Sequence, residues 1–233
     1  MVPRRLISAL AGLLLLGTAS ASAQPLRVIL VGDSTMATRT GYGDALCQRF
    51  KPEVSCINLA RGGRSSSSFR AEGLWDEAQQ LLNNKAFSAS LVLIQFGHND
   101  QPGKPGRSTD LATEFPANLA RYVLEAQALG ARPILLTPLT RRSFQGDLLN
   151  NDLSAWADAV RHVAVAQEVP LLDLNAQSAA AVQTMGQAKA DALAMPNQFD
   201  RTHLGDQGAQ LFSRMVLREL TKLVPDVAAE IKP

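Results

Sequence analysis

Residues 26–36 read Leu-Arg-Val-Ile-Leu-Val-Gly-Asp-Ser-Thr-Met, a pattern that indicates a buried strand followed by a tight turn. Its first six residues, Leu26–Val31, form an apolar, β-branched run of strand length, and Gly32-Asp33-Ser34 ends that run with turn-forming residues. Four similar runs follow along the chain, each succeeded by polar or glycine-containing residues: Val54–Leu59, Leu91–Phe96, Ile134–Thr137 and Val169–Leu172. The sequence therefore predicts five strands.

The segments between these runs have the apolar spacing of amphipathic helices. Three of them are Glu72–Asn83, Leu111–Leu129 and Leu148–Gln167, and a last helix is expected over about Asp206–Leu223, because Pro225 follows it. Apolar strands that alternate with helices indicate a parallel sheet covered on both faces. The expected fold class is α/β: a three-layer α/β/α, flavodoxin-like doubly wound parallel sheet of about five strands. In such a fold the site lies beyond the carboxyl ends of the strands.

The composition is that of an ordinary globular protein, with 46% apolar and 19% charged residues among 233. The net charge of +2 comes from Arg4 and Arg5, because the rest of the chain has as many basic as acidic residues. Without a basic stripe, neither nucleic acid nor an anionic membrane surface is an expected partner. Residues 24–233 contain no linker or repeat, so we expect one domain; the oligomeric state stays open, with a monomer favoured.

Residues 1–23 have the pattern of a signal peptide. Arg4 and Arg5 precede an apolar stretch around Leu13–Leu16, and Ala21-Ser22-Ala23 is a small-residue cleavage site. The alternative, a retained membrane anchor, fits the cleavage pattern less well. Later apolar runs are too short to span a bilayer. We therefore expect an exported protein, periplasmic or extracellular, without a membrane span.

Cys47 and Cys56 are the only two cysteines, and an oxidising compartment favours a disulfide between them over two buried free thiols. Closing so short a loop would stabilise the fold by roughly 2–3 kcal/mol on the chain-entropy model. The three histidines, His98, His162 and His203, are scattered, and no Cys-x-x-Cys motif occurs. We therefore expect no metal site.

Ser34 follows the first predicted strand directly, within Gly32-Asp33-Ser34-Thr35-Met36. A glycine before it permits a tight turn that exposes the hydroxyl where the next helix begins. The same residues also suit an ordinary turn and helix cap. Alone, the motif does not decide between the two interpretations.

Two further segments follow the second and third strands. Asn58–Ser65 contains Gly62 and Gly63, which let the backbone approach a ligand, although a flexible loop is the alternative. The glycine spacing of nucleotide-binding loops is absent. Gly97-His98-Asn99-Asp100 carries a side-chain amide that could stabilise an oxyanion, or could form an Asx turn.

Asp200-Arg201-Thr202-His203 precedes the last helix. A carboxylate and an imidazole three residues apart can lie within one turn, so Asp200 can accept from Nδ1 of His203 and leave Nε2 free for a serine proton. His162 lies within a helical pattern and is interpreted as a surface or satisfied core residue. All four segments fall at one predicted edge of the sheet.

These four segments resemble the four sequence blocks of the SGNH (GDSL-type) hydrolases, over about Val28–Leu220. Gly-Asp-Ser-Thr-Met, Asn-x-Ala-x-x-Gly-Arg-Ser, Phe-Gly-His-Asn-Asp and Asp-x-Thr-His-Leu look most like the rhamnogalacturonan acetylesterase branch. The resemblance implies Ser34 as nucleophile, His203 as base and Asp200 as its orienting acid. It also implies oxyanion donors from the Ser34 N–H, the Gly63 N–H and the Asn99 amide, with Gly62 as the alternative glycine.

We expect an exported serine esterase that removes acetyl or other small acyl groups from cell-wall polysaccharide of the rhamnogalacturonan or pectin type, without a cofactor. The alternatives are a lipid-directed esterase or lysophospholipase of the same superfamily and a non-catalytic carbohydrate-binding module. Several loop arginines favour a polar or acidic substrate: Arg39, Arg61, Arg64, Arg70 and Arg201. We expect Arg64, Arg201 and His98 to contribute to substrate binding.

Overall fold

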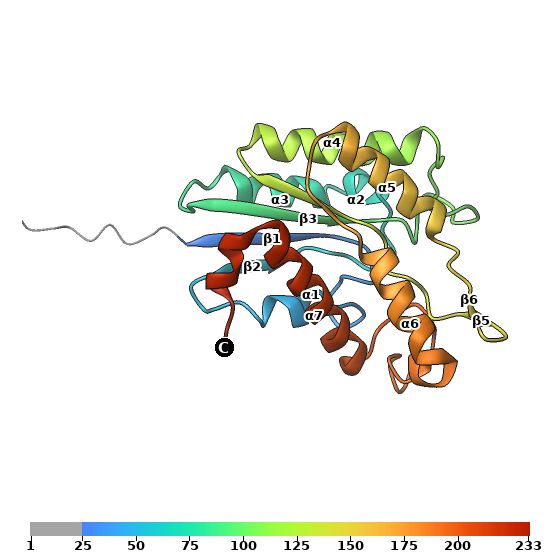
Figure 1. Cartoon of the computed structure of the whole chain (residues 1–233). Coiled ribbons are helices and arrows are strands. Elements are labelled where there is room, and N and C mark those ends of the chain that lie inside the picture. The colour runs from blue at the N-terminus through green and yellow to red at the C-terminus, as the bar shows by residue number, and fades with distance from the viewer. Residues whose placement is uncertain (1–24) are drawn as a thin grey trace, which may run out of the picture.

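A five-stranded parallel sheet forms the centre of the protein (Figure 1). The structure is a computed structural model and describes residues 25–233. The strand order is β2-β1-β3-β4-β7, with bounds Leu26–Gly32 for β1, Ser55–Asn58 for β2, Ala89–Gln95 for β3, Arg132–Leu136 for β4 and Leu171–Leu172 for β7. This is the flavodoxin-like order, in which the chain reverses direction across the sheet between β1 and β3. The predicted fold class is confirmed.

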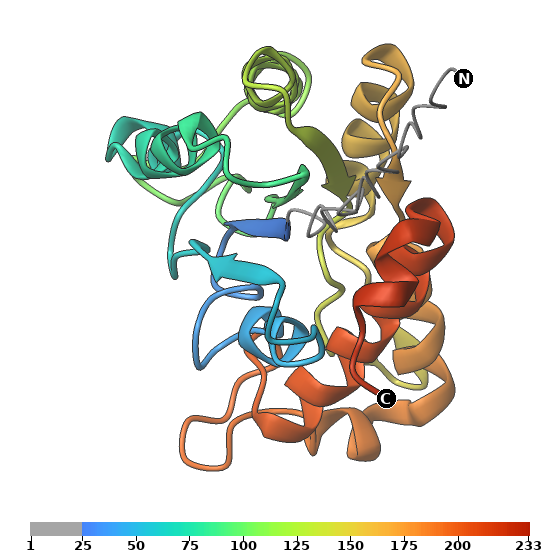
Figure 2. The same ribbon diagram turned by 90° about the vertical axis from the view of Figure 1, so that its left-hand side faces the viewer.

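Helices cover both faces of the sheet, as the end-on view makes clear (Figure 2). On one face lie α2 (Ser68–Ala71), α3 (Leu74–Asn83), α4 (Glu114–Ala128) and α5 (Ser154–Ala166). On the other lie α1 (Gly43–Cys47), α6 (Leu174–Asp191) and α7 (Asp206–Leu223), with the 3₁₀ helix η1 (Pro225–Glu230) after α7. The molecule therefore has three layers.

The side chains of β1 explain why both faces are covered. Val28 and Leu30 pack into the hydrophobic core beneath α1 and α7, whereas Ile29 and Val31 pack into the core beneath α3, α4 and α5. All four side chains are fully buried. Because successive residues of a strand point to opposite faces, a strand that is apolar at every position requires two apolar layers.

The predicted helix Leu148–Gln167 is wrong over its first six residues. Leu148–Leu149 forms β6, which pairs antiparallel with β5 (Phe144–Gln145), and α5 begins only at Ser154. Gly146 and Asp147 form the two-residue turn between these strands, and Gly146 has a φ of 59°. A glycine with positive φ is typical of such a hairpin turn.

Helix α6 was not expected from the sequence. It contains small and amide side chains, and its backbone leaves the helical conformation at Gly186, where φ is 70°. Its N-terminus is capped by Asp173, whose side chain accepts from the Ala176 N–H at 3.3 Å. Short helices α1 and α2 were also missed.

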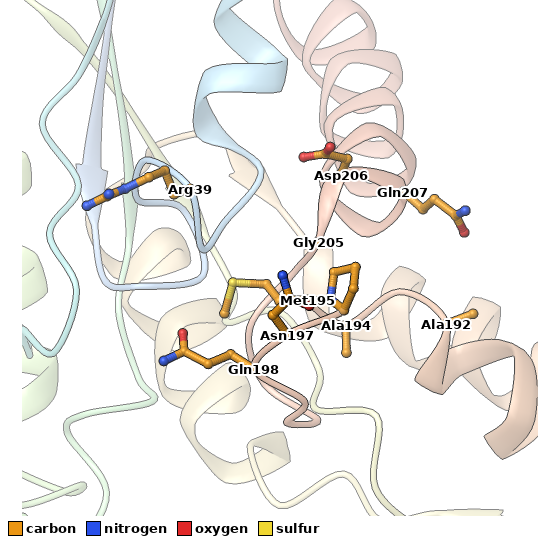
Figure 3. A pocket seen from close by; sticks show the side chains of 10 residues that line it. Arg39, Ala192, Ala194, Met195, Asn197, Gln198, Gly205, Asp206 and Gln207 are labelled. Atoms are coloured by element: carbon orange, nitrogen blue, oxygen red, sulfur yellow. The ribbon is translucent and has the colours of Figure 1, made fainter.

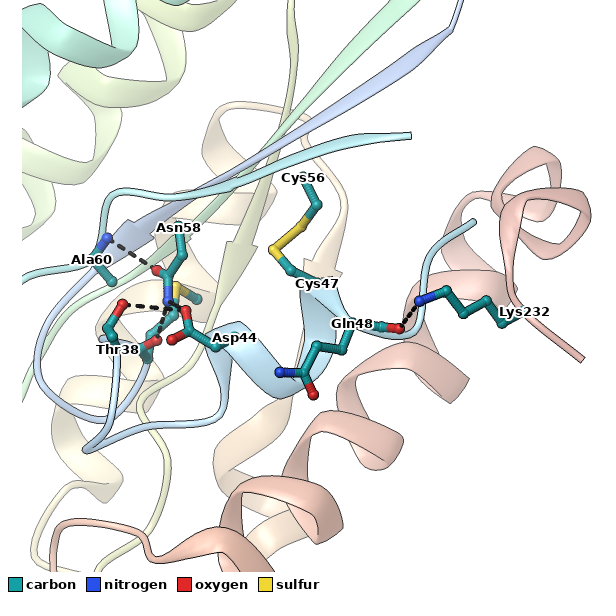
Figure 4. Close-up of a disulfide and its surroundings, with 9 residues drawn as sticks. Thr38, Asp44, Cys47, Gln48, Cys56, Asn58, Ala60 and Lys232 are labelled. Carbon is teal, nitrogen blue, oxygen red and sulfur yellow. Dashed lines mark hydrogen bonds between the residues drawn. A yellow bond between two sulfur atoms is a disulfide. The ribbon is translucent and has the colours of Figure 1, made fainter. Parts of the chain in front are cut away.

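The expected disulfide between Cys47 and Cys56 is confirmed (Figure 4). It joins the end of α1 to β2. Asn58 reinforces the same connection, because its side-chain amide donates to Asp44 at 2.7 Å and to the Met36 carbonyl at 3.1 Å. The loop that follows Ser34 is therefore tied to the edge of the sheet.

The expected signal peptide, residues 1–23, lies outside the described residues, and the single domain expected over 24–233 stays a prediction. Within residues 25–233, no helix has both the length and the apolar character needed to cross a bilayer.

Candidate active site

Ser34 occupies a tight turn at the carboxyl end of β1. Gly32 is required there, because a Cβ on this residue would lie 2.7 Å from the Gln95 carbonyl oxygen. Asp33 then closes the turn, since its Oδ1 accepts two hydrogen bonds from Thr35: one from the backbone N–H at 2.9 Å and one from the side-chain hydroxyl at 2.8 Å. The turn places Ser34 at the edge between β1 and β3.

Ser34, His203 and Asp200 form one hydrogen-bonded chain. Nε2 of His203 lies 2.8 Å from Oγ of Ser34, and Nδ1 of His203 lies 2.8 Å from Oδ2 of Asp200. Serine and histidine are 169 residues apart in the sequence. This geometry allows the imidazole to take the serine proton while the carboxylate orients the ring.

The Asp200 carboxylate is held by its own loop. Its Oδ1 accepts from the backbone N–H of Thr202 at 2.7 Å and of His203 at 2.6 Å. Burial raises the pKa of Asp200, but the hydrogen bonds from His203 and Thr202 together keep that pKa below its ordinary value. The carboxylate is therefore charged at neutral pH, as its partner ring requires.

Arg142 anchors the loop 200–203 from beneath. Its side chain is fully buried, and its guanidinium donates to the carbonyls of Asp200 at 2.9 Å, Thr202 at 3.3 Å and His203 at 2.6 Å. Sequence reasoning missed this residue. Its partners are backbone carbonyls about 60 residues away, so no local pattern could have indicated it.

Gly62 and Gly63 lie on the loop that faces Ser34. A Cβ on Gly62 would be 3.9 Å from the Ser34 Cβ, and Gly63 has a φ of 77°, a conformation that favours glycine. Asn99 approaches the same loop, because its side-chain amide donates to the Arg64 carbonyl at 3.0 Å. The structure thus brings both glycines and Asn99 to the edge that carries Ser34.

Asp100 fixes this arrangement from the interior. Its carboxylate accepts from the Ser66 N–H at 3.0 Å, the Ser66 hydroxyl at 2.6 Å and the Gly97 N–H at 3.0 Å. Burial raises the pKa of Asp100 to about 6, against the opposing hydrogen bonds of Ser66 and Thr109. The serine run 65–68 thereby links the glycine loop to the segment after β3.

His98 is buried behind the turn that carries Ser34. Only 2% of it is exposed, and its Nδ1 lies 3.2 Å from Oδ2 of Asp33. Burial would raise the pKa of Asp33, but the interactions with His98 and Thr35 keep it below its ordinary value. The geometry places His98 as a support for the turn, and its contribution to substrate binding stays a prediction.

A buried polar chain continues from Thr35 and was not anticipated. The Tyr42 hydroxyl donates to Gln95 Oε1 at 2.6 Å, and Gln95 Nε2 donates to the Thr35 hydroxyl at 2.7 Å. Gln95 is the last residue of β3, so this chain ties the ends of β1 and β3 together.

Arg64 and Arg201 are both paired with carboxylates. Arg64 forms an ion pair with Glu72 at 2.6 Å and also donates to the Gly62 carbonyl at 2.8 Å. Arg201 pairs with Asp191 at 3.0 Å. Each guanidinium therefore has a carboxylate partner, and the expected role of Arg64 and Arg201 in substrate binding stays a prediction. His162 is exposed on α5.

A cavity of about 710 Å³ lies beside the loops that carry the site (Figure 3). Its walls come from the loop with Arg39, the segment that precedes Asp200 and the start of α7, and its polar lining residues are Arg39, Asn197, Gln198, Asp206 and Gln207. Arg39 is adjacent to Thr40, whose hydroxyl donates to the Ser34 carbonyl at 2.8 Å. The cavity is thus close to the turn that carries Ser34, but Ser34 is not one of its lining residues.

Within the described part of the chain, no group of three histidine, cysteine, aspartate or glutamate side chains could hold a metal ion. The chemistry that the side chains can perform is nucleophilic attack by an activated serine hydroxyl. A three-layer α/β/α fold that brings Ser34, which follows β1, to Asp200 and His203, which precede α7, defines a serine hydrolase of the SGNH type.

The comparison with protein families agrees with this class. Residues 30–211 match the GDSL-like lipase/acylhydrolase family, and the chain belongs to that family. The protein is therefore a carboxylic ester hydrolase.

Two curated relatives come from Bacillus subtilis (strain 168). The rhamnogalacturonan acetylesterase RhgT is 30% identical over 86% of this chain and 91% of its own length. The probable rhamnogalacturonan acetylesterase YesY is 29% identical over 84% of this chain and 93% of its own length. The resemblance to the rhamnogalacturonan acetylesterase branch is confirmed.

Two solved structures share the fold. A Bacillus subtilis protein aligns with a TM-score of 0.71 at 23% identity over 86% of this chain, which spans 57% of that protein's length. The acetylxylan esterase Axe2 from Geobacillus stearothermophilus aligns with a TM-score of 0.62 at 24% identity, over 83% of this chain and 93% of its own.

Proposed function

We propose that this protein is an exported acetylesterase that removes acetyl groups from cell-wall polysaccharide of the rhamnogalacturonan or pectin type. The observation that carries the proposal is the hydrogen-bonded chain from Asp200 through His203 to Ser34. The names of the two curated relatives support the acetyl group and the polysaccharide. The disulfide between Cys47 and Cys56 supports an oxidising compartment, and the sequence pattern of residues 1–23 is typical of an export signal.

In the proposed mechanism, Oγ of Ser34 attacks the carbonyl carbon of the acetyl ester while Nε2 of His203 takes the hydroxyl proton. The tetrahedral intermediate collapses, the sugar oxygen leaves, and His203 returns the proton to that oxygen. Water then attacks the acetyl-enzyme with His203 again as base. The products are acetate, the deacetylated sugar and free enzyme.

The oxyanion of each intermediate needs hydrogen-bond donors. We assign this role to the Ser34 N–H, the Gly63 N–H and the Asn99 amide. The positive φ of Gly63, 77°, is a conformation that glycine adopts readily, and it supports a turn at this residue of the loop that faces Ser34. Gly62 gives the close approach, since a side chain there would face Ser34.

The cavity next to the site offers polar groups to a saccharide substrate. Its amide and carboxylate side chains, Asn197, Gln198, Gln207 and Asp206, can hydrogen-bond sugar hydroxyls. Ala192, Ala194, Met195 and Pro196 add apolar surface to the same cavity, so its lining is mixed, and the choice of a polysaccharide rests on the names of the curated relatives.

Two kinds of substrate test the proposal most simply: acetylated pectin and acetylated xylan, from which acetate is measured, and a lysophospholipid, from which fatty acid is measured. We expect the parent enzyme to release acetate from pectin fastest and Ser34→Ala to release none, while its melting temperature stays within a few degrees of the parent. Faster hydrolysis of the lysophospholipid would overturn the assignment of a polysaccharide substrate. Full activity in purified Ser34→Ala would remove Ser34 from the mechanism.

A further inference from the structure

Three cationic side chains border the candidate site, and we call Lys104, Arg107 and Arg141 the cationic cluster. Lys104 and Arg107 lie in the loop between β3 and α4, and Arg141 lies between β4 and β5. None of them was singled out from the sequence, because they lie outside the four sequence blocks.

Each member of the cluster contacts a different loop of the site. Nη1 of Arg107 donates to the Gly63 carbonyl at 3.4 Å, and Nζ of Lys104 donates to the His98 carbonyl. Nε of Arg141 donates to the Thr202 hydroxyl at 3.2 Å. The three cations therefore contact the glycine loop, the segment after β3 and the loop that holds Asp200 and His203.

The positive charge of the cluster exceeds the negative charge that is paired with it. Arg141 pairs with Asp152 at 2.6 Å, but over residues 25–233 neither Lys104 nor Arg107 forms an ion pair. Burial, followed by the charges of Arg141 and Arg107, lowers the pKa of Lys104, so the three charges interact. The charges of Asp33 and Asp152 oppose this lowering, but neither carboxylate forms an ion pair with Lys104. By contrast, Arg64 and Arg201 are each paired. Within residues 25–233, the cations of the cluster that lack an ion pair are therefore Lys104 and Arg107.

Both side chains keep donors free for a ligand. A guanidinium has five N–H donors, and Arg107 uses one of them in a long contact. Lys104 uses one of the three donors of its ammonium group. Two adjacent cations with unused donors form a binding site for an anion, and a planar guanidinium matches a carboxylate with two parallel hydrogen bonds.

We propose that Lys104 and Arg107, supported by Arg141, bind the carboxylate of a uronic acid residue next to the acetylated sugar. The inference rests on the proposed function, since it places the carboxylate on the same polysaccharide that presents its ester to Ser34. Recognition of an acidic substrate is thereby assigned to the loop between β3 and α4 and no longer to Arg64 and Arg201.

The test is a calorimetric measurement of the Kd for trigalacturonate and for its methyl ester, which has the same sugars without the charges. We expect the parent protein to bind the acid at least about tenfold more tightly, which corresponds to one charge-assisted hydrogen-bond pair. In Lys104→Met and in Arg107→Met this preference should fall to about threefold or less. Arg218→Met, which removes an exposed arginine of α7 that pairs with Glu219, should keep the full preference.

Equal affinity of the parent for the acid and the methyl ester would overturn the inference. So would variants that lose affinity for both ligands in the same proportion, because the cations would then only hold the loops in place. If a variant does not fold, the parent alone decides: raising the salt to about 0.5 M should weaken binding of the acid and leave the methyl ester unchanged. A salt-insensitive preference would contradict the inference.

The failure of the proposed function is distinguishable from the failure of this inference. Selective binding of the acid without any acetate release would support the carboxylate site and overturn the proposal that acetylated polysaccharide is the substrate. Acetate release without a preference for the acid would leave the acetylesterase standing and reject the carboxylate site.

Discussion

Asn99 donates one of its two amide hydrogens to the Arg64 carbonyl at 3.0 Å, and the second has no acceptor among the described residues. If that second hydrogen stabilises the oxyanion, Asn99→Ala should lower kcat by roughly 10²–10³ with little change in KM. Steady-state kinetics on p-nitrophenyl acetate would measure both. Asn118→Ala is the matched control, because its amide contacts the Ser66 hydroxyl of the same loop from α4. A loss seen mainly in KM would instead make Asn99 a residue that positions substrate.

The raised pKa of Asp100 should make the free energy of unfolding depend on pH. Its folded pKa of about 6 lies above the ordinary value of 3.8, because burial disfavours the charged form. The stability that this group contributes is therefore fully present below about pH 4 and is lost as the pH rises through 6, by roughly 3 kcal/mol. Asparagine cannot ionise, so Asp100→Asn should lack this slope. Urea unfolding of both proteins from about pH 4 to about pH 7 gives the difference, and parallel curves would contradict the assignment.

At the scale of elements, the loop 200–203 depends on Arg142. Arg142→Met leaves three carbonyls without their donor in a buried site, which should lower the free energy of unfolding by at least about 2 kcal/mol. Because the same carbonyls belong to Asp200, Thr202 and His203, kcat should fall by about 100-fold or more while KM changes little.

Chemical denaturation and kinetics on p-nitrophenyl acetate check both effects. Arg161→Met serves as the control, because Arg161 of α5 pairs with Asp158 of the same helix and with Asp173, which caps α6. Full kcat in a destabilised Arg142→Met would show that the guanidinium stabilises the fold without positioning His203. Arg142→Lys keeps the positive charge but lacks the planar guanidinium with its several N–H donors. The kcat of this variant relative to Arg142→Met would measure how much the charge alone contributes.

At the scale of the whole molecule, the sheet was predictable because its strands are apolar on both sides. Val28 and Ile29 are adjacent in the sequence and enter opposite cores, which only a covered parallel sheet permits. The last helix was predictable for a similar reason, since it carries an apolar stripe and a proline follows it. The hairpin at Leu148 was not, because its two leucines continue the apolar spacing of α5. Helix α6 gave little signal, since small residues leave it without an apolar stripe.

The predicted triad residues lie together because they follow β1 and precede α7, and topology brings those points to one edge. The residues that support them could not be predicted. Arg142, Gln95 and Tyr42 act on partners 53 to 61 residues away, through contacts that depend on the packed core. Arg64 and Arg201 were plausible ligand residues by position alone, and only the structure reveals their carboxylate partners.

Covalent labelling measures whether Ser34 is the activated nucleophile. A fluorophosphonate ester reacts with a serine hydroxyl only where a neighbouring base takes its proton. We predict one label per molecule, located on the peptide that contains Ser34 by mass spectrometry and absent from His203→Ala. Label on another serine, or no label on an enzyme that still releases acetate, would show that Ser34 is not the nucleophile.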